Sequence, residues 1–252
     1  SLRSDGLSIL LDKYIDLYCL YEDNLINCKK KKFNMNFITT YFRELALIED
    51  DLLKKMSKKR KKFRFRGRSY KSEYEKKMDQ KKKKPILDQS REDYIDIGNP
   101  NWEYRYYNKC LKIYDEDDIE ECCRNYLMGI VWTYEYYFNG CVCWNYKYMY
   151  RHAPALKNIV KTIEYFNFNS TKFNKNKPVS SIVQLLSILP KKSSDLLPKK
   201  YINIMYNSQI THLYPNKFEI DTYFKRYFWE CEPILPNIDI KQIERVVKKI
   251  KK

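Results

Sequence analysis

The chain has 252 residues, enough for one large domain or two small ones, and 44% of them are hydrophobic, as in folded proteins. Its formal net charge of +17 is concentrated, because residues 54–91 hold 18 Lys and Arg against 4 Asp and Glu while the rest of the chain holds 31 against 28. A protein that coats nucleic acid with its whole surface is therefore excluded, and eight cysteines in a chain of this length do not form a disulfide framework.

The expected setting follows from the same reading. The sequence has no signal peptide and no apolar run of membrane-spanning length, so we expect a soluble protein of a reducing compartment, in the cytoplasm or the nucleus, with no membrane partner. Because the chain starts with Ser1 and a helical pattern is already present at Leu7, we also expect it to be a piece of a longer polypeptide or one product of processing.

Two amphipathic helices open the chain. Apolar residues recur at helical spacing from about Asp5 to Tyr18, and again from about Asn36 to Leu52. This periodicity is lost over residues 54–97, which have too few apolar residues to order themselves alone. The basic segment is expected to be mobile or to project as a pair of charged helices, and to bind nucleic acid or an acidic partner. Its aromatic residues are candidates for stacking: Phe63, Phe65 and Tyr70.

The longest predicted helix covers residues 117–138. The acidic run Asp115–Asp118 is explained by capping and by the helix dipole, and Gly140 predicts a left-handed stop. Its buried stripe is predicted to comprise Ile119, Cys122, Cys123, Tyr126, Leu127, Ile130, Val131 and Tyr134.

Proline residues mark the expected starts of the next three helices. We expect helices from Pro154 to about Phe166, from Pro178 to Leu189 and from Pro198 to Tyr206. A short hairpin is expected within residues 218–229 and a last helix in residues 238–250. The fold class is therefore mainly α, an irregular multi-helix domain with a few short strands.

Aromatic residues crowd the stretch from Gly129 to Pro154, and Gly140 divides them. The spacing of Trp132, Tyr136 and Tyr137 favours a place in the core. Trp144, Tyr146 and Tyr148 alternate with other residues after the helix stop, where a ring can stack on a base for about 1–3 kcal/mol.

Three basic residues accompany the rings after the stop. Lys147, Arg151 and His152 offer cations to phosphates, although His152 equally suits a helix cap or a place in the core. The predicted RNA-binding set is therefore Trp144, Tyr146, Lys147, Arg151 and His152.

Catalytic alternatives find little support in the sequence. Zinc loops usually have a C-x₂₋₄-C spacing, which neither the adjacent cysteines at 122 and 123 nor the C-x-C pair at 141 and 143 matches. We interpret these cysteines as small buried hydrophobic residues. A contiguous acidic run does not supply carboxylates that converge from different elements onto two metal ions. Neither a phosphate loop nor a nucleophile elbow is present. We predict no catalytic residue and no metal ligand in this chain.

Several ordered motifs resemble one known family. Residues 129–154 match its pattern GLxWxxxYYYxGxxSWxWYYPxHYAP, and residues 184–201, QLLSILPKKSSDLLPKKY, match QLMxVLPxxSxxLLPxxY. The sequence LYPNKFEID at residues 213–221, then Trp229, then LPNID at residues 235–239 follow in the same order, and residues 102–109 resemble the upstream QYKxxYYxxK. On these motifs the chain is similar to the second conserved, helical region of Xrn-type 5′→3′ exoribonucleases, outside the basic segment.

The resemblance implies a role in RNA degradation such as mRNA decay. In that family the helical region follows a nuclease half, which it braces, and it lines the path of single-stranded RNA with an aromatic residue, for which Trp144 is the candidate. The acidic cluster that binds Mg²⁺ and the pocket for a 5′-monophosphate belong to the nuclease half, so this chain would need that half in cis or as a separate chain. A catalytically inactive scaffold or RNA-binding subunit is the alternative.

Some departures from the family pattern fall in residues 146–152. Tyr146 replaces a Trp, Met149 replaces a Pro, and Arg151-His152 stand where the family has His-Tyr. The expected organisation is N-terminal helices in residues 1–53, the basic insertion in residues 54–97 and the main helical region in residues 98–252.

Overall fold

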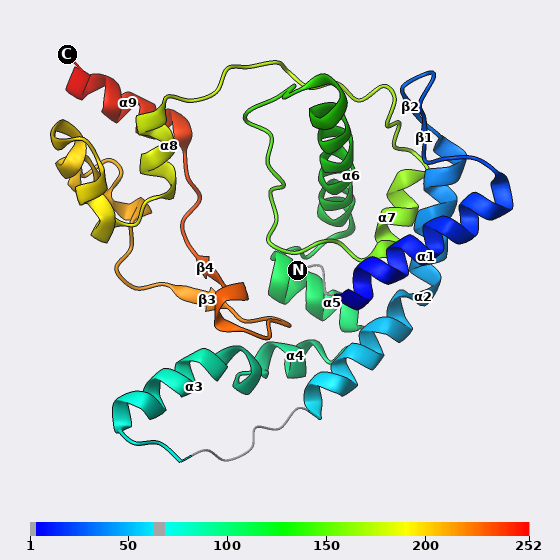
Figure 1. The fold of residues 1–252 in the computed structure, drawn as a ribbon, viewed down its shortest axis with the longest axis horizontal. Helices are drawn as coiled ribbons and strands as arrows, with labels where there is room; N and C mark the ends of the chain where they lie inside the picture. The colour runs from blue at the N-terminus through cyan, green and yellow to red at the C-terminus, as the bar shows by residue number, and fades with distance from the viewer. Residues whose placement is uncertain (1–3, 63–68, 252) are drawn as a thin grey trace. The chain divides into compact units, whose positions relative to one another are not determined.

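The computed structural model describes residues 4–62 and 69–251, and it is mainly helical with two short hairpins (Figure 1). This confirms the predicted fold class. The chain divides into two compact units: unit 1 is Ser1–Lys77 with Ile86–Asn176, and unit 2 is Met78–Pro85 with Lys177–Lys252. The two units are defined by contacts within the structure. The three-part division expected from the sequence is defined by where the positive charge is concentrated, and it stays a prediction.

Unit 1 begins with two packed helices, α1 (Ser4–Tyr21) and α2 (Met35–Lys61), and a small hairpin of β1 (Ile26–Asn27) and β2 (Lys32–Phe33). The Tyr41 hydroxyl donates to the Leu10 carbonyl oxygen (2.9 Å) and joins the two helices. Helix α2 starts where expected, because the Asn34 side chain caps it by accepting from the Phe37 amide.

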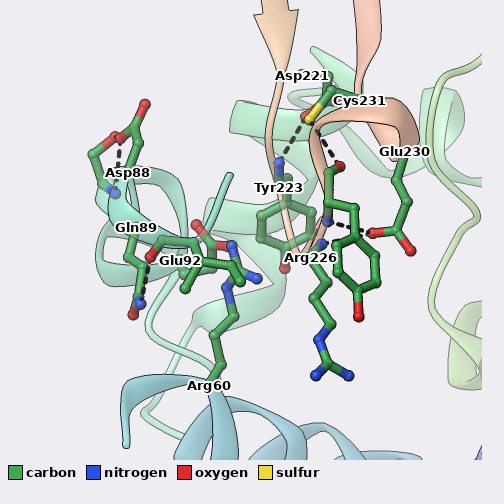
Figure 2. A network of polar contacts seen from close by, with 12 residues as sticks. Arg60, Asp88, Gln89, Glu92, Asp221, Tyr223, Arg226, Glu230 and Cys231 are labelled. Atoms are coloured by element: carbon green, nitrogen blue, oxygen red, sulfur yellow. Dashed lines mark hydrogen bonds and ion pairs between the residues drawn. The ribbon is translucent and has the colours of Figure 1, made fainter. Parts of the chain in front are cut away.

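The basic segment contains helices, which was one of the two alternatives expected from its sequence. Helix α2 continues to Lys61, and α3 (Glu73–Leu87) and α4 (Ser90–Ile95) follow; Phe63 and Phe65 lie outside the described residues. An ion pair explains the extension of α2: Arg60 Nη2 lies 2.6 Å from Glu92 Oε1 on α4, with side chains only 8% and 3% exposed (Figure 2). A buried charge needs such a partner, so the sequence-distant Glu92 orders the end of α2.

The core of unit 1 forms around the predicted long helix. Next along the chain come α5 (Trp102–Tyr106), a π-helical turn η1 (Tyr107–Leu111), α6 (Glu116–Asn139) and α7 (Leu156–Ile163). The Asp115 carboxylate caps α6 by accepting from the Asp118 amide (2.8 Å), which confirms the capping role of the acidic run. The predicted stripe is confirmed in its centre; its fully buried members are Cys122, Cys123, Leu127, Val131 and Tyr134, and Ile119, Tyr126 and Ile130 are half-buried.

Unit 2 has a separate apolar core built from short helices. Its elements are α8 (Ser181–Ile188), the 3₁₀ helices η2 (Lys191–Leu196), η3 (Lys199–Tyr206), η4 (Thr211–Leu213) and η5 (Phe228–Glu230), the strands β3 (Glu219–Asp221) and β4 (Glu232–Ile234), and α9 (Ile240–Lys251). The expected hairpin exists, but its second strand lies beyond Trp229: Glu219 is in register with Ile234 and Asp221 with Glu232. Figure 2 shows the loop between these strands, where Glu230 accepts from the Arg226 amide (2.6 Å).

Candidate nucleic-acid interface

The chain turns back on itself at the end of α6. Figure 1 shows residues 140–155 running along α6 toward α5, antiparallel to the helix. Gly140 makes the turn with φ 79° and ψ −176°, a conformation essentially restricted to glycine. The predicted glycine stop is therefore present, but its ψ differs from that of a left-handed helical cap.

The returning segment is bonded to α6 at its start. The indole Nε1 of Trp132 donates to the Cys143 carbonyl oxygen (2.8 Å), and the Trp144 amide donates to Asn176 Oδ1 (2.7 Å). Farther along, the Met149 amide donates to Asn125 Oδ1 (2.9 Å). These bonds fix the backbone at residues 143–144 and at residue 149, within the stretch that carries the predicted RNA-binding residues.

Even-numbered side chains of residues 146–152 face the protein. Tyr146 stacks on Trp132, with ring centroids 5.9 Å apart and an interplanar angle of 22°, and its hydroxyl donates to the Asn125 carbonyl oxygen (2.7 Å). A Cβ on Gly129 would lie 2.9 Å from that hydroxyl, so the ring fits because residue 129 is glycine. Burial raises the pKa of Tyr146 to about 12, as expected for a hydroxyl used in packing.

Tyr148 and His152 continue this inner face. The Tyr148 hydroxyl donates to the His152 carbonyl oxygen (2.8 Å) and lies 3.4 Å from Cys122 Sγ, and burial raises its pKa. The half-buried His152 ring lies 6.4 Å from the ring of Tyr106, edge to face. Tyr106 in turn donates to the Ala153 carbonyl oxygen (2.6 Å). The inner residues thus hold the segment in place.

Odd-numbered side chains face outward. Lys147, Met149 and Arg151 are all exposed, and so is Trp144, with 55% of its surface accessible. The structure therefore leaves Trp144, Lys147 and Arg151 exposed, while the half-buried Tyr146 and His152 lie on the inner side of the segment. We call the exposed residues Trp144, Lys147 and Arg151 the outer row.

The expectation of a core place for the rings before Gly140 is wrong for two of them. Tyr136 and Tyr137 are 48% and 77% exposed, whereas Trp132 is half-buried. Tyr136 stacks on Trp132 with centroids 5.3 Å apart and an interplanar angle of 13°. Helical spacing did indicate that Tyr136 lies outside the core. Positions 125, 129, 132 and 136 fall on the helix face opposite the buried stripe.

Neither a metal site nor a membrane span is found among the described residues. Within residues 4–62 and 69–251, no group of three or more His, Cys, Asp or Glu side chains is arranged to hold a metal ion. Cys122 and Cys123 are buried, and burial raises the pKa of both thiols. In the same described ranges, every helix is too short or too polar to span a bilayer.

Comparison with known proteins gives a consistent result. The family model described as the Xrn1 helical domain matches residues 17–252. The 5′-3′ exoribonuclease 2 of Candida albicans is 34% identical over 167 residues, covering 64% of this chain and 17% of that protein. The 5′-3′ exoribonuclease 2 of Schizosaccharomyces pombe is 32% identical over 177 residues, covering 68% and 18%. The 5′-3′ exoribonuclease 1 of Saccharomyces cerevisiae is 27% identical over 146 residues, covering 56% and 9%. The chain thus spans less than a fifth of the length of these relatives.

Proposed function

We propose a function from one premise: the chain belongs to the Xrn family of 5′-3′ exoribonucleases, of which it carries the helical domain. In this proposal it is the helical part of an enzyme that degrades 5′-monophosphorylated single-stranded RNA from the 5′ end. It braces the catalytic half, present in cis or as a separate chain, and lines the path of the RNA.

The outer row is the proposed RNA contact. Trp144 offers an exposed ring for stacking on a base, worth about 1–3 kcal/mol, while Lys147 and Arg151 attract the phosphates on either side. The fixed backbone supports this role, because a segment whose backbone is already held loses little backbone freedom when RNA binds. Tyr146 and His152 act indirectly in this scheme, by holding the segment against the protein.

Metal chemistry is assigned to another part of the enzyme. Nucleases generally use divalent metal ions, and Mg²⁺ is the proposed ion here. The residues that the structure describes do not fit a metal site, and no step of hydrolysis is assigned to them. The carboxylates that would hold Mg²⁺ are proposed to lie in the catalytic half.

Binding of single-stranded RNA to the 252-residue chain tests the outer row. We expect Trp144→Ala to weaken binding of a fluorescent oligonucleotide about 10-fold, which corresponds to roughly 1.4 kcal/mol. Tyr165→Ala is the matched control, because Tyr165 is an aromatic residue of unit 1 that is 83% exposed and lies outside the outer row. Equal effects of the two substitutions would contradict the assignment.

Degradation assays separate the enzyme from its alternative, a catalytically inactive scaffold or RNA-binding subunit. Three features favour this alternative: the replaced Trp at Tyr146, the replaced Pro at Met149 and the basic insertion in residues 54–97. The complete polypeptide that contains the chain should shorten 5′-phosphorylated RNA processively in Mg²⁺. RNA binding that depends on Trp144 without any shortening would identify the inactive form.

A further inference from the structure

Unit 2 contains a pocket that shares no residue with the outer row. Its volume is about 390 Å³, near the lower end of the range for small-molecule sites. It is lined by Gln209, Gln242, Arg245, Lys248 and Lys249. Four of these residues come from α9, whose opposite face is buried through Ile243, Val246 and Val247. The same amphipathic helix that closes the core of unit 2 therefore supplies most of the residues that line the pocket.

Hydrogen bonds position several of the pocket side chains. Gln242 Nε2 donates to the Gln209 carbonyl oxygen (2.6 Å), and Lys249 Nζ donates to Gln209 Oε1 (3.3 Å). Arg245 Nε donates to the Lys241 carbonyl oxygen one turn earlier on α9 (3.3 Å). The two bonds to Gln209 tie α9 to the loop before η4, so that the wall is partly organised without a ligand.

The charge of the pocket is poorly balanced. Three cations line it, and the nearest carboxylate pairing is loose, with Arg245 Nη2 at 3.8 Å from Asp239 Oδ2 and both side chains exposed. Across the part of the chain that the structure describes, no carboxylate lies within ion-pair distance of Lys248 or Lys249. Counting Asp239, the pocket has a net charge of about +2.

We propose that this pocket binds a phosphate monoester. Such a group carries about −1.5 to −2 charges near pH 7 and several acceptor oxygens, which match three cationic donors and the charge surplus. A phosphodiester of a nucleic-acid backbone carries only one negative charge and leaves the surplus in place. The amide groups of Gln209 and Gln242 can bond hydroxyls of the attached sugar. The proposal is independent of the outer row, which belongs to unit 1.

Titration of the 252-residue chain with uridine 5′-monophosphate, followed by calorimetry or ³¹P NMR, tests the proposal. Saturable binding is expected for the monophosphate and not for uridine. The pair Lys248→Gln and Lys249→Gln, introduced together, should weaken binding at least 10-fold, because two of the three cations are lost. Lys241→Gln removes the same kind of charge from an exposed position of α9 outside the pocket, and should change the affinity less than twofold.

The pH dependence of binding and a second ligand test which chemical group the pocket recognises. Binding to the unaltered chain should weaken from pH 7 to pH 5, because the monoester takes up a proton near pH 6. A 5′-phosphorylated dinucleotide that binds as well as the monophosphate would show that the site accepts an RNA end, and one that fails to bind would restrict it to free nucleotides. Absence of saturable monophosphate binding up to about 10 mM, or equal losses from Lys241→Gln and the double substitution, would overturn the proposal.

Discussion

Replacing Glu49 with glutamine should change how the stability of unit 1 depends on pH. Glu49 lies on α2, and both of its carboxylate oxygens accept from the Leu156 amide at the start of α7 (3.0 and 2.8 Å). Burial raises the pKa of this carboxyl to about 7, although the hydrogen bonds from the α7 backbone act in the opposite direction. Its desolvation therefore outweighs its favourable position at a helix N-terminus.

The sign and size of the effect follow from this shift. The folded chain binds the proton more tightly than the unfolded chain, in which the pKa is about 4.5. The stabilisation is complete below pH 4.5 and is lost as the pH rises through about 7. A shift of this size corresponds to about 3 kcal/mol. The glutamine side chain of the Glu49→Gln variant does not titrate. We therefore compare the free energy of unfolding of the unaltered chain with that of the variant. The difference, unaltered chain minus variant, should fall by about this amount between pH 4.5 and pH 8.5.

Hydrogen exchange of the buried α7 amides of Ile159 and Ile163 measures this difference for unit 1 alone. Glu44→Gln, which removes a carboxylate from the same helix, is the control for a general change in net charge. A difference that stays constant with pH would refute the reasoning. A difference that rises with pH would show that the N-terminus of α7 favours the anion more than burial disfavours it.

Three more substitutions test the packing. Gly129→Ala should destabilise unit 1 by about 1–3 kcal/mol in urea unfolding, since the new Cβ meets the Tyr146 hydroxyl, and Tyr146→Phe in the same chain should relieve part of that loss. Arg60→Ala should cost about 3–5 kcal/mol because Glu92 is left as a buried charge, and adding Glu92→Gln should recover part of it; independent effects would contradict the pairing. Asp115→Ala should cost about 0.5–2 kcal/mol in thermal unfolding by removing the cap of α6, whereas Asp115→Asn should cost less.

Local signals predicted the start and end of α6 well. Asp115 and Gly140 act on their immediate neighbours, so their roles can be read without knowing the fold. The buried stripe of α6 was equally accessible, because helical spacing alone places Cys123, Leu127 and Val131 on one face. The family resemblance rested on such local motifs and was confirmed by the match to residues 17–252.

Contacts between distant residues explain what the sequence did not reveal. The half-buried state of Trp132 depends on Tyr146, which stacks on it from the segment that returns along α6, and that return cannot be read from helical spacing. The extension of α2 depends on Glu92, which lies 32 residues after Arg60. The first hairpin is fixed by Asn169, whose side chain bonds the backbone of Phe33 at a separation of 136 residues. The role of the outer row in RNA binding stays a prediction.

The alternation along residues 146–152 separates two kinds of evolutionary constraint. Replacing Tyr146 or Tyr148 removes a ring from the packing against α6, so selection for folding acts on these positions. Replacing Lys147 or Arg151 changes an exposed side chain and leaves that packing intact. If the outer row binds RNA as proposed, mutation can change its affinity or nucleotide preference in small steps, without passing through unstable intermediates.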